Sequence, residues 1–141
     1  MATPDELRTA IGDGRQALKD AISAAASGWE RTAAGENEDA WNARQTAEHV
    51  IPSEAFFTSA VCSACGYPGV DEVKGDYATA AAALAHLETV VEMCNKKLKY
   101  VSETDIEIRN EEWKTNVAGM LEFNAAHLND HAAQIRAAAG V

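Results

Sequence analysis

Two histidines near the C-terminal end of the sequence, His127 and His131, are the residues best suited to chemistry. They lie in a run rich in Ala and Leu, which are strong helix formers, with no strong helix breaker before Gly140. Residues four apart on a helix share one face and are about 6 Å apart along its axis, so both imidazoles can reach one metal ion. The alternative is that one histidine belongs to the core and the other interacts with the helix C-terminal dipole.

A third histidine, His49, follows Trp41 by eight residues in a predicted second helix. This spacing, together with the H-x-x-x-H motif and the Gln-Ile that follows it, resembles the DinB/YfiT-like superfamily. The resemblance implies a four-helix bundle in which one histidine of the second helix and two of the fourth hold a divalent metal. The matching positions are His49, His127 and His131. Superfamily members with a known activity include metal-dependent transferases and isomerases that use low-molecular-weight thiols, and homodimers are frequent.

Capping patterns and apolar spacing predict four helices over residues 4–29, 43–65, 77–101 and 116–139. Each begins after a residue whose side chain can cap a helix N-terminus: Thr3, Asn42, Asp76 and Thr115. A chain of 141 residues is long enough to bury a core without disulfides. We therefore expect one all-α domain, a DinB-like four-helix bundle over residues 1–141.

The third predicted helix carries two apolar series with a seven-residue period, as expected for a helix packed in a bundle. The series are Tyr77, Leu84, Val91, Leu98 and Ala80, Leu87, Cys94, Val101. His86 falls outside both series, which predicts that it faces solvent rather than the metal. Between the third and fourth helices, Thr104 to Trp113 alternates isoleucine with charged residues and predicts an extended segment across the mouth of the bundle.

Glu54 falls on the apolar stripe of the second predicted helix, where an unpaired carboxylate would be unfavourable. It is a candidate general base, or a carboxylate that hydrogen-bonds a metal ligand; the alternative is a boundary residue that reaches solvent. Pro52 predicts a kink one turn after His49, which either aims the imidazole or bends the helix around the core. Asn124 and Gln134 share the face of the histidine pair and are candidate hydrogen-bond partners for it.

Cys62 and Cys65 form a C-x-x-C motif that ends at Gly66, a predicted helix C-terminus. Redox-active motifs of this kind begin a helix, where the dipole stabilises the thiolate, whereas the C-terminal end disfavours it. Two cysteines are also fewer than the four ligands of a structural zinc site. We expect both to act as small apolar side chains.

The composition limits the partners. Asp and Glu number 22 against 12 Lys and Arg, a net charge of −10, which argues against nucleic acid and anionic membranes. The sequence begins without the pattern of a signal peptide and has no apolar run of membrane-spanning length. Three cysteines fit a reducing compartment, so the prediction is a cytoplasmic protein with a small-molecule substrate.

Three neutral imidazoles suit zinc or nickel, and also iron or copper, and leave coordination positions open. A metal so bound lowers the pKa of water to about 7 or activates a thiol. Two alternatives to a thiol-using enzyme remain. One is a homodimeric bundle that binds a metal or small ligand without catalysis; the other is a helical interaction module whose histidines are incidental.

Overall fold

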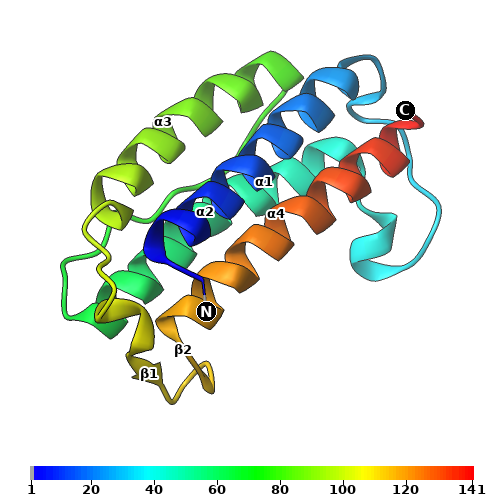
Figure 1. Ribbon diagram of the computed structural model, residues 1–141. Coiled ribbons are helices and arrows are strands. Elements are labelled where there is room, and N and C mark those ends of the chain that lie inside the picture. Colours follow the sequence, from blue (N-terminus) through cyan, green and yellow to red (C-terminus); the bar gives the residue numbers. More distant parts are fainter. Residues whose placement is uncertain (1) are drawn as a thin grey trace.

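The computed structural model describes residues 2–141, and within them every side chain except that of Glu38. The described chain forms an all-α four-helix bundle, as predicted (Figure 1). Its helices are α1 (Pro4–Ala24), α2 (Ala43–Cys65), α3 (Ala80–Leu98) and α4 (Val117–Ala139). The shorter elements are the 3-10 turns η1 (Ala26–Gly28), η2 (Asn37–Ala40) and η3 (Asp105–Glu107) and the strands β1 (Arg109–Asn110) and β2 (Thr115–Asn116).

The helices form two parallel pairs that run in opposite directions. Helices α1 and α4 run one way, and α2 and α3 run the other way (Figure 1). This order requires residues 66–79, the crossover segment, to return along the bundle between the end of α2 and the start of α3. As a result α2 and α4 lie antiparallel and side by side, which brings the start of α2 next to the end of α4.

Helix α1 packs closely on α4 because one of its contact positions is a glycine. A Cβ atom at Gly14 would lie 3.0 Å from Cβ of Leu128 and 3.2 Å from the carbonyl oxygen of Ala125. Any larger side chain there would push the two helices apart. The close approach fixes the position of α4 and therefore of the histidines that it carries.

Two predicted helix starts are confirmed. The Thr3 hydroxyl accepts a hydrogen bond from the Glu6 amide at the start of α1. At the start of α2, Asn42 and Gln45 form a reciprocal capping box. Both patterns are local in sequence, so they need no tertiary contact to act.

The other two predicted caps are wrong, and tertiary contacts give the reason. Helix α3 begins at Ala80 and is capped by Thr79, because the carboxylate of Asp76 is engaged by Arg44 at 2.7 Å. Helix α4 is capped by Asn116. Thr115 is instead paired with Asn110 in the two-stranded ladder.

The predicted end of the first helix at Trp29 is also too late. Helix α1 ends at Ala24 and the chain tightens into η1. Gly28 packs against the end of α4, where a Cβ atom would lie 2.6 Å from the carbonyl oxygen of Ala139. Trp29 is buried, and its indole N–H donates to the carbonyl oxygen of Tyr77.

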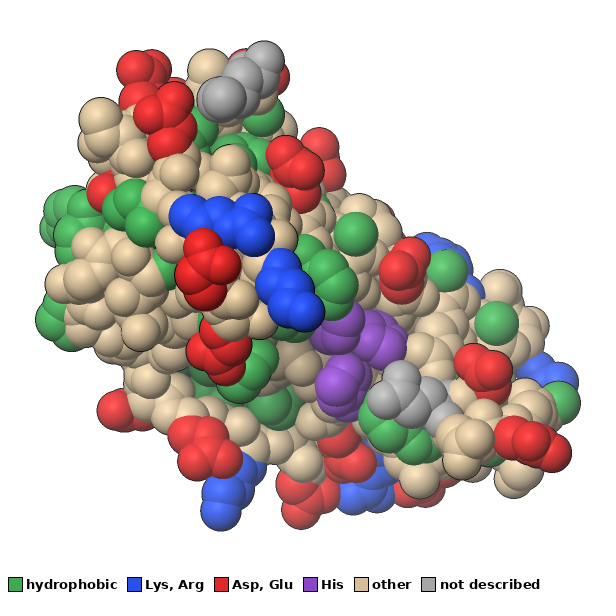
Figure 2. Space-filling model, turned by 90° about the horizontal axis from the view of Figure 1, so that it is seen from below, with side chains coloured by type: hydrophobic (Ala, Val, Ile, Leu, Met, Phe, Trp, Pro, Cys, Tyr) green, Lys and Arg blue, Asp and Glu red, His purple; other side chains and the backbone are tan. Residues whose placement is uncertain are grey.

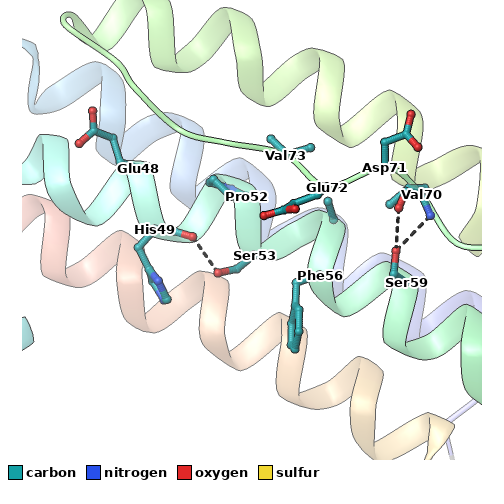
Figure 3. Close-up of a pocket in the computed structure, with 11 residues that line it drawn as sticks. Glu48, His49, Pro52, Ser53, Phe56, Ser59, Val70, Asp71, Glu72 and Val73 are labelled. Carbon is teal, nitrogen blue, oxygen red and sulfur yellow. Dashed lines mark hydrogen bonds between the residues drawn. The ribbon is translucent and has the colours of Figure 1, made fainter.

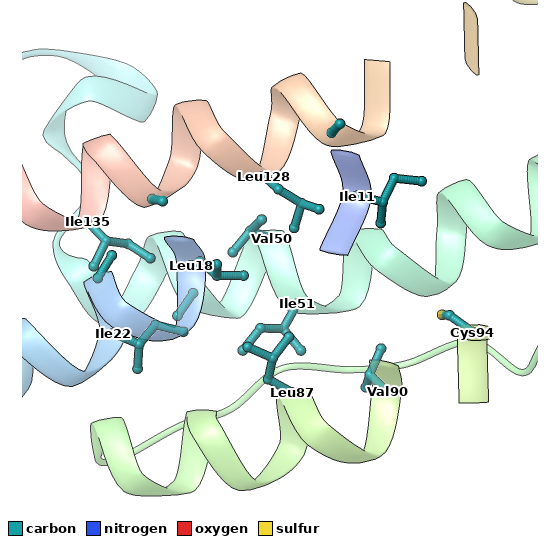
Figure 4. Close-up of a cluster of buried hydrophobic side chains, with 14 of the residues drawn as sticks. Ile11, Leu18, Ile22, Val50, Ile51, Leu87, Val90, Cys94, Leu128 and Ile135 are labelled. Atoms are coloured by element: carbon teal, nitrogen blue, oxygen red, sulfur yellow. The ribbon is translucent and has the colours of Figure 1, made fainter. Parts of the chain in front are cut away.

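The bundle interior is filled by aliphatic side chains from all four helices (Figure 4). On α3 the buried face differs from the prediction, since Leu84 and Val91 are only partly buried. The buried residues of that helix are Ala80, Ala83, Leu87, Val90, Cys94 and Leu98. Successive buried residues are therefore three or four positions apart and form one stripe, as a straight helix against a core requires.

One ion pair lies inside the core. Glu54 is 1% exposed and its two carboxylate oxygens accept hydrogen bonds from Arg15 at 3.1 and 2.8 Å. Arg15 also donates to the side-chain oxygen of Asn95 at 2.6 Å. These contacts join α1, α2 and α3, and they exclude the predicted alternative that Glu54 reaches solvent.

The segment from Thr104 to Trp113 is not a single extended strand. It forms η3 and then β1, which pairs with β2 in a short antiparallel hairpin before α4. Ile106 of η3 is buried, and Trp113 packs beside Phe57 of α2. Within the described residues, no helix carries an apolar stretch of the length needed to cross a membrane.

Candidate metal centre

Three histidines from two helices converge at the antiparallel contact of α2 and α4. The Nε2 atom of His127 lies 3.3 Å from Nε2 of His49 and 3.0 Å from Nε2 of His131. The ligand nitrogens of all three residues lie within 4.8 Å of one another. The predicted convergence of these residues is thus confirmed, although His49 lies 78 positions before His127 in the sequence.

These distances suit a shared metal ion. Two nitrogen ligands at about 2.0–2.1 Å from a tetrahedral zinc ion lie about 3.3 Å apart. The two short Nε2 separations, 3.3 and 3.0 Å, match that value. The donor set is entirely imidazole nitrogen, which suits zinc, nickel, copper or iron rather than magnesium or calcium. The three histidines therefore form a group that could hold a transition-metal ion.

A hydrogen bond fixes the proton of one ligand. His131 Nδ1 lies 2.7 Å from the side-chain carbonyl oxygen of Gln134, which can only accept, so Nδ1–H donates. In the neutral ring this places the free lone pair on Nε2, which faces the other two histidines. Gln134 thus acts as the predicted hydrogen-bond partner behind the ligands, the arrangement that commonly orients metal-binding histidines.

The surroundings of His127 favour its neutral ring. Burial, and then the proximity of His131 and His49, lower the pKa of His127 from 6.5 to about 4. At neutral pH this imidazole is therefore uncharged and its lone pair is available to a metal.

Aromatic side chains surround the histidines. Trp41 lies 5.2 Å from His49 between ring centroids, and Phe57 lies 5.0 Å from His127. Phe123 stacks on His127 at 6.2 Å, and its ring is 52% exposed. Figure 2 shows histidine side chains at the surface with hydrophobic side chains beside them. The cluster is thus open to solvent on one side and bounded by aromatic walls.

A cavity of about 460 Å³ lies beside His49, between α2 and the crossover segment (Figure 3). The Ser59 hydroxyl holds the crossover segment through both the N–H and the carbonyl oxygen of Val70. Figure 3 shows Glu72 extending toward Pro52, whereas Asp71 points away from α2. The cavity is large enough for a small molecule next to the histidines.

Helix α2 is continuous through Pro52. Pro52 has no N–H to bond the carbonyl oxygen of Glu48. Gly75 packs on that free carbonyl, where a Cβ atom would lie only 2.7 Å from the oxygen. The proline therefore makes room for the crossover segment one turn from His49, and the predicted kink of the helix stays a prediction.

The remaining candidate residues are not members of the three-histidine group. Glu54 is bonded to Arg15, and a general-base role for it stays a prediction. The side chain of Asn124 is buried, and its oxygen has no hydrogen-bond partner among the described residues. His86 is not one of the three clustered histidines; it is partly buried and contacts the Tyr77 hydroxyl at 2.6 Å.

The cysteines are free thiols away from the histidine cluster. Burial raises the pKa of Cys62, and burial followed by the charge of Asp105 raises that of Cys65 to about 11. Burial likewise raises the pKa of Cys94 to about 11. Thiols with these pKa values are protonated at neutral pH, which agrees with the predicted role as small apolar side chains.

Sequence reasoning missed the aromatic walls and the partner of Glu54. Phe57 contacts His127, and Trp113 packs against Phe57, but only the antiparallel packing of α2 and α4 brings Phe57 beside His127. Arg15 offered one signal, since it follows Gly14 inside the apolar stripe of α1. A cation at a core position of one helix could have been matched with a carboxylate at a core position of another.

The fold and the site together define a four-helix bundle with a three-histidine group at the contact of α2 and α4. A family profile described as the DinB superfamily matches residues 2–135. This chain therefore belongs to the DinB superfamily. No curated protein matches it, and no solved structure does.

Proposed function

We propose that this protein is a metal-dependent transferase or isomerase that acts with a low-molecular-weight thiol. His49, His127 and His131 hold the metal, zinc or nickel. The observation that carries the metal site is the short distance from Nε2 of His127 to Nε2 of His131, 3.0 Å, and to Nε2 of His49, 3.3 Å. Membership of the DinB superfamily supports the thiol-dependent reaction, because characterised members of the DinB/YfiT-like superfamily include such enzymes.

The bound ion would act as a Lewis acid that lowers the pKa of a thiol or water and so supplies a nucleophile at neutral pH. The chain's own residues set the surroundings. Gln134 fixes the tautomer of His131. Phe57 and Phe123 cover His127, and the cavity beside His49 receives the substrate. Aromatic walls limit water around the site, which strengthens the electrostatic interactions within it.

The metal content of untagged protein tests the first half of the proposal. We expect about one equivalent of zinc or nickel in the wild type. His127→Ala should lose most of this metal, because two histidines are fewer than the three protein ligands of a catalytic zinc site. His86→Ala is the matched control, since it removes an imidazole outside the cluster. Equal metal in wild type and His127→Ala would leave the histidines incidental and the interaction-module alternative standing.

A turnover assay tests the second half. Candidate thiols and electrophiles in large excess over metal-loaded protein should give many turnovers, and His127→Ala should give none. Product that stops at one equivalent per chain would favour the non-catalytic alternative, a bundle that binds metal or a small ligand. That alternative draws support from Glu54, because both oxygens of this candidate base are already bonded to Arg15.

A further inference from the structure

Helices α2 and α3 terminate at the same end of the bundle (Figure 1). A second cavity lies there, lined by residues at and just after the two helix ends. Its volume is about 560 Å³, within the range of small-molecule sites. It shares no residue with the three-histidine group, and Cys62 on its floor lies about 20 Å along α2 from His49. The residues that line it are Cys62, Tyr67, Pro68, Lys96, Lys97 and Tyr100.

Exposed aromatic rings gather at this cavity. Among the described residues, the large apolar or aromatic side chains that are strongly exposed include Phe56 and Phe123, which lie near the histidines. The other exposed rings are those of Tyr67, at 37%, and Tyr100, at 65%, and both line this cavity. Solvent-exposed rings that face one hollow provide stacking surfaces for a planar ligand.

Each tyrosine side chain has a polar or charged neighbour. The Tyr67 hydroxyl donates to Asp105, and this bond is the main reason that the pKa of Tyr67 is raised to about 12. Lys99 Nζ lies 5.1 Å from the centroid of the Tyr100 ring, a cation–π distance. A ligand ring would therefore meet the Tyr67 ring in a position that its bond to Asp105 holds.

The charge at the mouth of the cavity is positive although the chain as a whole carries −10. Lys97 is partly buried and forms no ion pair within residues 2–141, whereas Lys96 is 3.6 Å from Glu92. The nearest buried carboxylate, that of Asp105, already accepts from Tyr67 and from the Ser102 amide. The lysines also offset the C-terminal dipole of α3, but that role needs no adjoining cavity.

We propose that this cavity binds a small aromatic anion, with its ring against Tyr67 and Tyr100 and its carboxylate or sulfonate at Lys96 and Lys97. The chemistry of the lining is complementary to both parts of such a ligand: π-faces for the ring and ammonium groups for the charge. This site is independent of the metal-dependent function proposed above, because no lining residue contacts the histidines.

The test uses 2-naphthoate as the probe and the whole chain labelled with nitrogen-15. Titration should give saturable amide shifts confined to residues 62–68 and 96–101, with those around the histidines unmoved. Lys97→Gln and Tyr100→Ala should each weaken binding about tenfold, the loss expected for one charged hydrogen bond or one stacked ring. Lys74→Gln is the charge-matched control and Phe56→Ala the aromatic control, and neither should change the affinity.

Three results can overturn the proposal. If neutral 2-naphthamide binds as tightly as 2-naphthoate, or if Lys97→Gln has no more effect than Lys74→Gln, then charge does not select the ligand. If sedimentation shows wild-type self-association that Tyr100→Ala abolishes, then a second copy of the chain occupies this surface. Circular dichroism of each variant establishes that it is folded before its affinity is compared.

Discussion

Replacing Arg15 with methionine tests whether the Arg15–Glu54 pair supports the fold. The variant leaves the Glu54 carboxylate, which is 1% exposed, without the two hydrogen bonds of 3.1 and 2.8 Å that it accepts. Removing one partner of a buried ion pair destabilises a protein by about 3–5 kcal/mol, because the other charge stays buried without compensation. For a chain of this size that corresponds to a fall in melting temperature of about 10–15 °C.

The double variant Arg15→Met with Glu54→Leu separates pairing from packing. Replacing a buried ion pair with apolar side chains of similar size is often neutral or stabilising. We therefore expect the double variant to recover most of the stability that Arg15→Met loses. Urea and thermal unfolding of metal-free protein measure both changes in the free energy of unfolding.

Lys19→Met provides the control on the same helix. Lys19 lies 3.6 Å from Glu88, but these side chains are 43% and 70% exposed. An exposed pair of this kind contributes about 0–1 kcal/mol. The reasoning is refuted if Arg15→Met destabilises no more than Lys19→Met, or if the double variant is as unstable as the sum of its single changes.

The same double variant also tests Glu54 as a general base. It keeps the three histidines and removes the carboxylate without leaving a buried charge. If Glu54 acts only through the fold, the folded double variant should keep its metal content and its turnover. A folded, metal-loaded double variant without turnover would support the general-base role.

Two further predictions concern the histidine group, and a third concerns the packing of the crossover segment on α2. The pKa of His127 is lowered to about 4 in the folded state, against about 6.5 in the unfolded state, so its neutral form contributes stability that is present above pH 6.5 and lost as the pH falls toward 4. The melting temperature of metal-free protein should therefore fall over that pH range. The fall should be less steep in His127→Gln. A chelator should lower the melting temperature of metal-loaded wild type and of His86→Ala, while that of His127→Ala should stay constant. Gly75→Ala should destabilise the fold by about 1–3 kcal/mol, since the added Cβ would lie 2.7 Å from the Glu48 carbonyl oxygen. Gly12→Ala is the control: no heavy atom lies within 4 Å of a Cβ there, so the stability of the fold should stay unchanged or rise slightly.

The local features of the fold were predictable because their causes lie within a few residues. Thr3 with Glu6 and Asn42 with Gln45 cap α1 and α2 through bonds that span three positions. Where a cap competes with a distant partner, prediction failed. Asp76 has the right side chain to cap α3 but is bonded to Arg44, which lies on another helix.

The candidate site was predictable in its members, not in its surroundings. The family resemblance singled out His49, His127 and His131, and the helical spacing placed the last two on one face. Phe57 contacts His127 on α4 and Trp113 in the hairpin before α4, so these surroundings depend on how α2, α4 and the hairpin pack together. Such contacts join residues far apart in the chain and leave no short-range pattern.

The sequence by itself determined the helices, the acidic surface and the spacing that places His127 and His131 on one face. These follow from local hydrogen bonding, from apolar periodicity and from the charge count. Only the tertiary structure decided that His49 meets them, that Arg15 is the partner of Glu54, and that Tyr67 and Tyr100 share a cavity with two lysines. Each of these depends on which helix faces are buried together, and that choice is made by packing of the whole bundle.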